Sequence, residues 1–374
     1  MPLVKNARQV TIFKELERYN CQVGATQLAN GDVVVIYNKA RGLAHLDFDS
    51  IALIRSTDNG ETWEPKTERM VWECTHTFGT DTPSVMQLRD GTLLCNFLMT
   101  AFVGRKGIYE DYGPQSAVLL SMRECDGVWL TRSNDNGESW QPAYKASVSP
   151  MRWGQPIDEP IELPDGTLLM AVQGMMRARA YHSDEEPYRC FLIRSDNKGE
   201  DWEHWSTIAY DAAGIISFSE PALGRMPDGT LIAMMRTMHQ PHRKHQHMWV
   251  AYSRNDGESW SQPECTNLWG YPADLTLLQD GRMLCTYGYR RDPYGVHGCI
   301  SNDGIHWDVK NEFIIREGGT APVEVQPNWY WHIGYPTSIQ LKNGTIFTVD
   351  HRWTDTAPYV QYVVGVLWEL SDIP

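Results

Sequence analysis

The sequence predicts an all-β fold, a six-bladed β-propeller of four-stranded antiparallel sheets, because two short turn motifs alternate along its 374 residues. The first motif is an apolar residue, two spacers that usually end in Asp or Asn, then Gly and an apolar run. Asn-Gly or Asp-Gly between apolar runs is a strong hairpin signal, since these residues tolerate positive φ. The motif occurs six times, at 28–35, 88–94, 163–169, 226–232, 278–284 and 341–347.

The second motif is Ser-x-Asp-x-Gly-x-x-Trp or a close relative of it. The Ser and Asx side chains can bond nearby backbone groups while Gly takes the strained position, which indicates another hairpin turn. The third and fourth copies carry Asn197 and Asn255 in place of the aspartate, and the fifth copy is one residue shorter. The motif occurs five times, at 56–63, 133–140, 195–202, 253–260 and 301–307.

The alternation of the two turns predicts four strands in each repeat and six repeats in the chain. The last repeat has no second turn of its own, so its third strand is expected within 359–370. We expect residues 8–13, from the other end of the chain, to supply the missing fourth strand. That pairing would close the ring and hide both sheet edges. We therefore expect a single propeller domain over residues 1–374.

Composition excludes several classes of partner. The formal charge of −14 leaves no basic surface for nucleic acid or for an anionic membrane. No apolar run is long enough for a membrane span or a signal peptide, and the eight cysteines are scattered without a CxxC pair. We expect a reduced, cytoplasmic protein without cofactor or metal. The oligomeric state is left open.

The repeat pattern indicates which end of the propeller carries function. Both turn types fall at one end of each blade, so the other end collects the residues that begin each inner strand and end each second strand. Loops held by a rigid scaffold are where functional residues gather. At the strand starts stand Asp81, Asp158, Glu159, Glu220, Tyr271, Asp274 and Tyr335. At the strand ends or just after them stand Arg41, Arg236, His239, Arg290 and Arg352.

Five such Ser/Trp turns in register with six hairpin turns resemble the sialidase superfamily over nearly the whole chain. The resemblance implies glycoside hydrolysis by a tyrosine that a glutamate activates. It assigns the glutamate to Glu220, the nucleophile to Tyr335, and one arginine of a carboxylate-binding triad to Arg236. It places the acid/base in the loop before the first Ser/Trp turn, where Asp47 and Asp49 are the candidates.

The sequence departs from that family at two places. The family opens its first blade with an aromatic-Arg-Ile-Pro motif, whereas residues 19–24 read YNCQVG and contain no arginine. Where the last triad arginine is expected, Arg290 and Arg291 lie out of register and His297 lies nearer. A triad of arginines grips a carboxylate by paired charge-assisted hydrogen bonds. The terminal sugar is therefore expected to be either acidic or neutral.

The carbohydrate substrate is expected to contact one group of charged rim residues. These are Arg41, Asp81, Arg236, His239, Asp274, Arg290 and Arg352. A second catalytic arrangement is also open, in which Asp158 and Glu159, with Glu220 one blade on, supply acid and base without a tyrosine.

Two other functions remain alternatives. A histidine and a tyrosine can cleave uronic-acid polysaccharides by elimination, with His239 or His297 as the histidine. A propeller of this kind can also bind carbohydrate without cleaving it.

Overall fold

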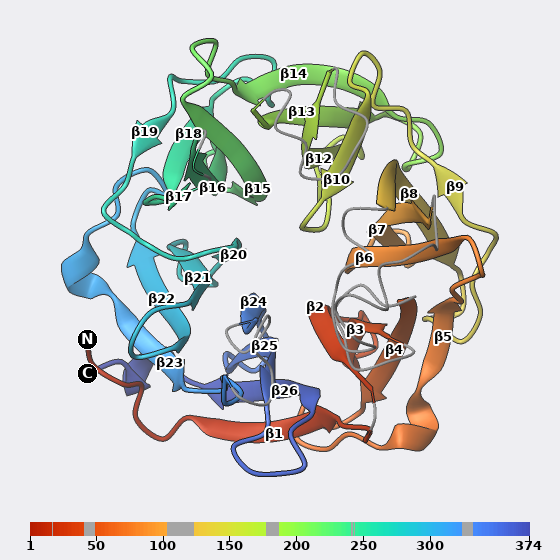
Figure 1. The fold of residues 1–374 in the computed structure, drawn as a ribbon, viewed down its shortest axis with the longest axis vertical. Helices are drawn as coiled ribbons and strands as arrows, with labels where there is room; N and C mark the ends of the chain where they lie inside the picture. The colour runs from red at the N-terminus through yellow and green to blue at the C-terminus, as the bar shows by residue number, and fades with distance from the viewer. Residues whose placement is uncertain are drawn as a thin grey trace.

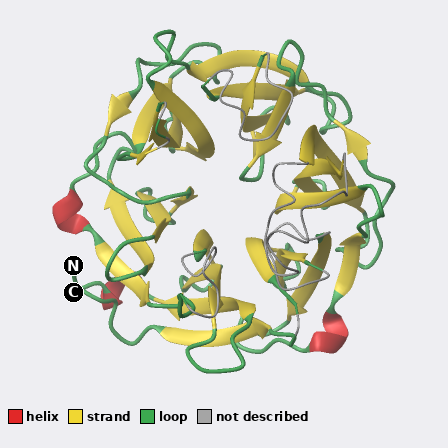
Figure 2. Ribbon diagram, viewed as in Figure 1, coloured by secondary structure: helices red, strands yellow, loops and turns green. Residues whose placement is uncertain are grey.

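The structure is a computed structural model whose described part comprises residues 1–16, 18–40, 49–102, 123–176, 187–240, 242, 244–323 and 332–374. Six antiparallel sheets stand around a central axis, as predicted (Figure 1). The described residues are almost free of helix, and Figure 2 shows only short helical turns at the rim. These turns are Pro65–Thr67, Val309–Asn311 and Leu370–Asp372.

The first three blades follow the chain in order, each with its innermost strand first. Blade one contains β2 (Asn20–Gln27), β3 (Val33–Lys39), β4 (Ser50–Ser56) and β5 (Arg69–Trp72). Blade two contains β6 (Phe78–Gln87), β7 (Leu93–Phe102), β8 (Arg123–Ser133) and β9 (Tyr144–Lys145). Blade three contains β10 (Trp153–Pro156), the short β11 (Ile161–Glu162), β12 (Leu168–Met175), β13 (Arg189–Ser195) and β14 (Glu203–Ala209).

The last three blades repeat this order, and the sixth borrows its outer strand from the N-terminus. Blade four contains β15 (Ile216–Arg225), β16 (Leu231–His239), the short β17 (Lys244–His245), β18 (Trp249–Ser253) and β19 (Glu264–Cys265). Blade five contains β20 (Ala273–Leu277), β21 (Met283–Tyr289), β22 (Gly295–Ser301) and β23 (Phe313–Glu317). Blade six contains β24 (Gly334–Gln340), β25 (Ile346–Trp353), β26 (Gln361–Trp368) and β1 (Arg8–Phe13).

The ring closes as the sequence predicts. Strand β1 pairs antiparallel with β26, with Arg8 opposite Leu367 and Val10 opposite Gly365. The two ends of the chain lie together at the rim (Figure 1), where Lys5 N donates a hydrogen bond to Asp372 O at 2.9 Å. Closure removes the two free sheet edges that an open array of blades would expose.

The Ser/Trp turns are structural. In the first copy Gly60 N donates to Ser56 Oγ at 3.0 Å, Thr62 N donates to Asp58 Oδ1 at 2.9 Å, and Trp63 Nε1 donates to Gly60 O at 2.9 Å. The Trp63 ring then stacks on Phe347 of the neighbouring blade, with ring centroids 5.8 Å apart. These turns therefore hold adjacent blades together at the end opposite the predicted site.

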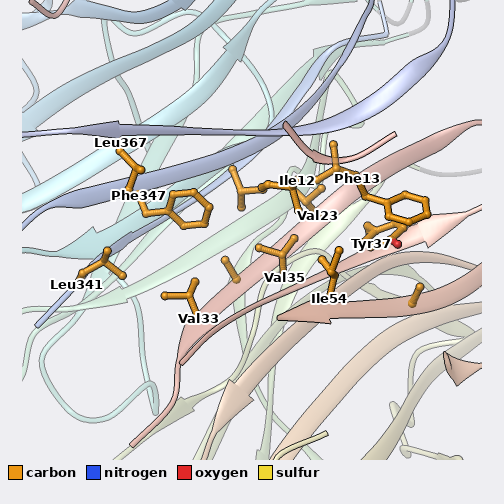
Figure 3. Packing of buried hydrophobic residues seen from close by; sticks show 14 residues of the cluster. Ile12, Phe13, Val23, Val33, Val35, Tyr37, Ile54, Leu341, Phe347 and Leu367 are labelled. Atoms are coloured by element: carbon orange, nitrogen blue, oxygen red, sulfur yellow. The ribbon is translucent and has the colours of Figure 1, made fainter. Parts of the chain in front are cut away.

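The hydrophobic core lies between adjacent sheets and leaves the ring centre to other residues. Figure 3 shows one such layer between blades six and one. Its labelled members are Ile12, Phe13, Val23, Val33, Val35, Tyr37, Ile54, Leu341, Phe347 and Leu367. Because the blades are fixed by these layers, the ends of the inner strands form a rigid frame around the axis.

No helix in the described part of the chain is both long enough and apolar enough to cross a membrane.

Candidate functional site

Four of the inner strands carry the same distortion near their first residues. Each has a break in register that contains a non-glycine residue with φ between 45° and 57°. These residues are Gln22, Thr82, Glu220 and Tyr335. A left-handed conformation costs an L-residue about 1 to 2 kcal/mol and persists where the surrounding structure imposes it, most often at functional sites. The repeated distortion therefore marks this end of the ring as the candidate site.

Glu220, Arg236 and Tyr335 come together, as the family resemblance implies. Tyr335 Oη donates a hydrogen bond to Glu220 Oε1 at 2.9 Å, and Arg236 Nη1 donates to the same oxygen at 2.6 Å. Glu220 Oε2 is buried and has no hydrogen-bond partner among the described residues. Strands β15 and β16 of blade four supply two of the residues and β24 of blade six supplies the third. The carboxylate thus retains one oxygen for a ligand or a proton.

The Tyr335 phenol is protonated at neutral pH. Burial raises its pKa, and the charge of Glu220 raises it further, while Arg290 and Arg236 oppose this rise. A phenol in this environment becomes a nucleophile only when a base removes its proton as it reacts. Glu220 Oε1 already accepts that hydrogen.

Arg290 joins the site although its sequence position is out of register with the family. Its Cζ lies 4.8 Å from the Tyr271 ring centroid and 5.2 Å from the Tyr335 ring centroid. Its Nε donates to Ile333 O at 3.1 Å. Tyr271 also contacts Arg236, whose Cζ is 4.1 Å from the ring centroid. One aromatic ring therefore contacts both arginines.

The histidine beside Arg236 is His245, which the sequence reasoning missed. Arg236 Nε lies 3.3 Å from His245 Nδ1, and Arg236 Nη2 lies 2.9 Å from His245 Nε2. The predicted residue His239 is exposed, and strand alternation turns it to the face opposite Arg236. The segment 239–247 contains four histidines, and only the pairing of β17 with β16, which sets Met238 opposite His245, distinguishes them.

Two further histidines lie on another side of Tyr335. Tyr19 Oη and His332 Nδ1 are 2.6 Å apart, and Gln22 N donates to His351 Nδ1 at 3.0 Å. The His332 and His351 rings lie 5.8 and 6.0 Å from the Tyr335 ring. His332 has no motif around it that would have pointed to the site.

Asp81 lies in the same neighbourhood. Its Oδ1 accepts hydrogen bonds from Thr82 N at 3.0 Å and from Asn38 Nδ2 at 3.5 Å. Its charge is among the causes that raise the pKa of Tyr335. The structure therefore places this predicted binding residue near Tyr335.

Asp158, Glu159 and Asp274 form a separate acidic group on the axis. Burial raises the pKa of Asp158, and the charges of Glu159 and Asp274 raise it further. Burial and Glu159 raise the pKa of Asp274 to about 8, while Ser338 N donates to Asp274 Oδ2 at 3.0 Å. These acids interact with one another, whereas the hydrogen bonds of Glu220 join it to Arg236 and Tyr335.

A small axial cavity connects the two groups. Its volume is about 20 Å³, enough for a water molecule. Its lining includes Gln22, Thr82, Asp158, Asp274 and Tyr335. Among the described residues, no group of three or more His, Cys, Asp or Glu side chains could hold a metal ion.

Arg352 lies away from Tyr335, whereas Asp49 lies near Tyr19, whose pKa burial raises and the charge of Asp49 raises further. Arg352 bonds Asp355, the Gln9 side chain at 3.2 Å and Trp353 O at 3.2 Å, so its guanidinium is used at the edge of blade six. Asp49 is completely buried, and its carbonyl oxygen accepts two hydrogen bonds from Thr80 at 3.0 Å.

Two predicted residues, Asp47 and Arg41, lie outside the described residues. His297 is fully buried in blade five, where its Nδ1 is 3.1 Å from Glu312 Oε1. With His239 exposed on the opposite face of its strand, neither histidine proposed for an elimination reaction lies beside Tyr335 in this structure.

Comparison with known proteins gives the following similarities. Residues 114–348 match the family described as BNR repeat-like domain, and residues 54–65 match the BNR/Asp-box repeat. A sialidase of Paraclostridium sordellii is 27% identical over 187 residues, which are 47% of this chain and 42% of that protein. The match thus spans less than half the length of that relative.

Two solved structures share the fold over nearly all of the chain. A protein of unknown function from Dyadobacter fermentans has a TM-score of 0.79 at 22% identity, covering 97% of this chain and 99% of its own. The Hadza microbial sialidase Hz136 has a TM-score of 0.67 at 17% identity, covering 95% of this chain and 66% of its own.

Proposed function

Because the chain belongs to the BNR repeat-like family of the sialidase-like superfamily, we propose that it is a glycoside hydrolase releasing the terminal sugar of a glycan. The main observation in support is that one carboxylate oxygen, Glu220 Oε1, accepts hydrogen bonds from both Tyr335 and Arg236. Neither a lectin nor a scaffold needs a phenol directed at a buried carboxylate.

In the proposed reaction Tyr335 Oη attacks the anomeric carbon while its proton passes to Glu220 Oε1. A covalent glycosyl–tyrosine forms and the aglycone leaves with a proton from an acid on the other side. Water then attacks the anomeric carbon and gives its proton to the conjugate base of that acid, while the departing phenolate recovers its proton from Glu220. Arg236 and Arg290 stabilise the negative charge that develops on the phenol, since both oppose the rise in its pKa.

The proton donor belongs in the segment from Asp47 to Asp49, by resemblance to the family. Asp49 directly precedes β4, and its carbonyl oxygen accepts a hydrogen bond from Thr80 of blade two at 3.0 Å. Asp49→Asn should slow hydrolysis of alkyl glycosides much more than that of nitrophenyl glycosides, because a nitrophenolate leaves without a proton. Equal slowing of both substrates would show that Asp49 is not the proton donor.

The test of the proposal is turnover. Wild type is screened on aryl glycosides and oligosaccharides, and Glu220→Gln is compared on any substrate found. Loss of the base should lower kcat by roughly 100- to 10,000-fold, while the melting temperature and substrate binding persist. Glu258→Gln, in an exposed turn at the far end of blade four, is the matched control and should retain activity. Binding of glycans without release of sugar by wild type would instead support a non-catalytic carbohydrate-binding protein.

A further inference from the structure

Each nitrogen of the Arg236 guanidinium has a partner within hydrogen-bond distance. Its Nη1 donates to Glu220 at 2.6 Å. The other edge, formed by Nε and Nη2, faces the His245 ring at 3.3 and 2.9 Å. That edge has two parallel N–H groups, which a carboxylate could bind through both oxygens.

His245 is held in this position from two sides. Its backbone belongs to β17, which pairs with the end of β16 and sets His245 opposite Met238. Its ring centroid lies 4.2 Å from that of Tyr271, on which Arg236 also stacks. The imidazole, the guanidinium and the aromatic ring therefore contact one another and form one wall of side chains.

The imidazole occupies this place as a neutral acceptor. Burial lowers the pKa of His245 to about 2, and the charges of Arg236 and Arg290 contribute to that fall. A neutral ring nitrogen can accept from Arg236 as a carboxylate oxygen would, without adding charge. The second arginine, Arg290, already uses its Nε, which donates to Ile333 O at 3.1 Å.

We propose that His245 determines specificity by closing Arg236 to carboxylates, so that the pocket takes a terminal sugar without a carboxylate group. This inference rests on the proposed function, because it names the substrate class of the same site. An acidic sugar would have to displace His245 from both Arg236 and Tyr271 before it could use the paired N–H groups. A neutral sugar leaves that wall intact.

The first measurement uses wild type and pairs of sugars. In each pair one member carries a free carboxylate and the other carries a neutral group at the same carbon. The pairs are glucose with glucuronic acid, galactose with galacturonic acid, and the methyl ester of N-acetylneuraminic acid with the free acid. Calorimetry gives the association constant of each sugar, and the acid-to-neutral ratio of each pair is the association constant of the acid divided by that of the neutral member. We expect the neutral member to bind more tightly in the best-bound pair. Tighter binding of the acid by about tenfold or more, the strength of one charged hydrogen bond, would overturn the inference.

The second measurement removes the imidazole. His245→Ala and His245→Asn should each raise the acid-to-neutral ratio by about tenfold or more, since the Arg236 edge becomes available. Adding Arg236→Lys to either variant should abolish the gain, because an ammonium group lacks the paired N–H geometry. His247→Ala, an exposed histidine two residues away, is the matched control and should leave the ratio unchanged. Melting curves identify which variants are folded.

The outcomes separate this inference from the proposed function. The inference is overturned if a folded His245 variant has the same acid-to-neutral affinity ratio as wild type. It is also overturned if that variant binds no sugar acid. Either result counts even if wild type hydrolyses a glycoside. A raised ratio supports it even if no substrate is turned over, in which case only the hydrolytic proposal fails.

Discussion

At the residue scale, the site depends on a single oxygen atom that two donors share. Tyr335 and Arg236 both donate to Glu220 Oε1, so the carboxylate is oriented before any substrate arrives. The left-handed backbone at Glu220 and Tyr335 is what directs the two side chains toward each other from different blades. An oriented base beside a nucleophile is the arrangement that covalent catalysis requires.

Tyr335→Phe should abolish hydrolysis while keeping the fold and sugar binding. The substitution removes only the hydroxyl that lies 2.9 Å from Glu220, so the ring still packs near Arg290 and His351. We expect kcat to fall by roughly a thousandfold or more with little change in affinity. Steady-state kinetics and calorimetry of the same protein check this. A variant that retains more than a tenth of the wild-type kcat would show that the phenol is not the nucleophile.

The sequence predicted the grouping of Glu220, Arg236 and Tyr335 better than what surrounds them. The resemblance to the sialidase superfamily singled out these three residues, and the turn motifs place each at the start or end of a strand. His245 could not, because the choice among four histidines depends on how β17 pairs with β16. Arg352 was expected to bind substrate, but it bonds Asp355 and also Gln9 of the outer strand β1, which is distant in sequence.

Asp274 should make the protein more stable as the solution becomes mildly acidic. Burial and the charge of Glu159 raise its pKa to about 8, whereas an unfolded aspartate titrates near 3.9. The folded state therefore binds the extra proton between these values, and this contribution to stability is lost as the pH rises through about 8. The free energy of unfolding should fall with pH by up to about 1.4 kcal/mol per pH unit in this range.

Asp274→Asn, which cannot titrate, should flatten this dependence between about pH 5 and pH 8. Asp280→Asn, in an exposed turn of the same blade, is the control and should keep the slope, because Arg282 lowers the pKa of Asp280 well below that range. Chemical denaturation across the pH range measures both. A slope in Asp274→Asn equal to that of wild type would contradict the assignment.

At the element scale, the two turn motifs determine where strands begin and end. The Asx-Gly turns and the Ser/Trp turns could be read directly, because their residues are required by local backbone geometry. The breaks in register near Gln22, Thr82, Glu220 and Tyr335 could not be read in this way. They place ordinary residues in a left-handed conformation, which depends on contacts between blades.

Two glycines with positive φ separate local strain from packing between blades. A Cβ at Gly31 would meet nothing within 4 Å, whereas one at Gly257 would lie 2.4 Å from Leu192 Cδ2 of blade three. Gly31→Ala should cost about 1 to 2 kcal/mol of unfolding free energy through φ alone. Gly257→Ala should cost about 1 to 3 kcal/mol more through overpacking. Denaturant unfolding of both variants checks this, and equal losses would mean that the turn does not pack against the next blade.

At the scale of the whole molecule, ring closure is what brings residues from blades four and six to one place. Closure depends on β1, which supplies the outer strand of blade six and the buried side chains Ile12 and Phe13. This pairing could be predicted from sequence because the last repeat lacks one strand. The contacts that line the ring centre needed the structure.

Deletion of residues 1–13 should destabilise the ring and cause self-association. It removes three core side chains, Val4, Ile12 and Phe13, worth about 1.5 to 3 kcal/mol each, and exposes the edge of β26. Melting and size-exclusion chromatography measure the two effects. Ile12→Ala, which keeps the strand, should lower stability by about 2 to 5 kcal/mol and remain unassociated. An unassociated deletion variant with the wild-type melting temperature would show that the ring does not depend on β1.

The central claim is that Tyr335, activated by Glu220, forms a bond to the sugar. Trapping with activated 2-deoxy-2-fluoro glycosides of the hydrolysed sugar, followed by peptide mass spectrometry, tests it most directly. We predict that the sugar is found on Tyr335 and that Glu220→Gln slows its attachment. A sugar attached to a carboxylate such as Glu159, or an inverted product without any adduct, would contradict the account.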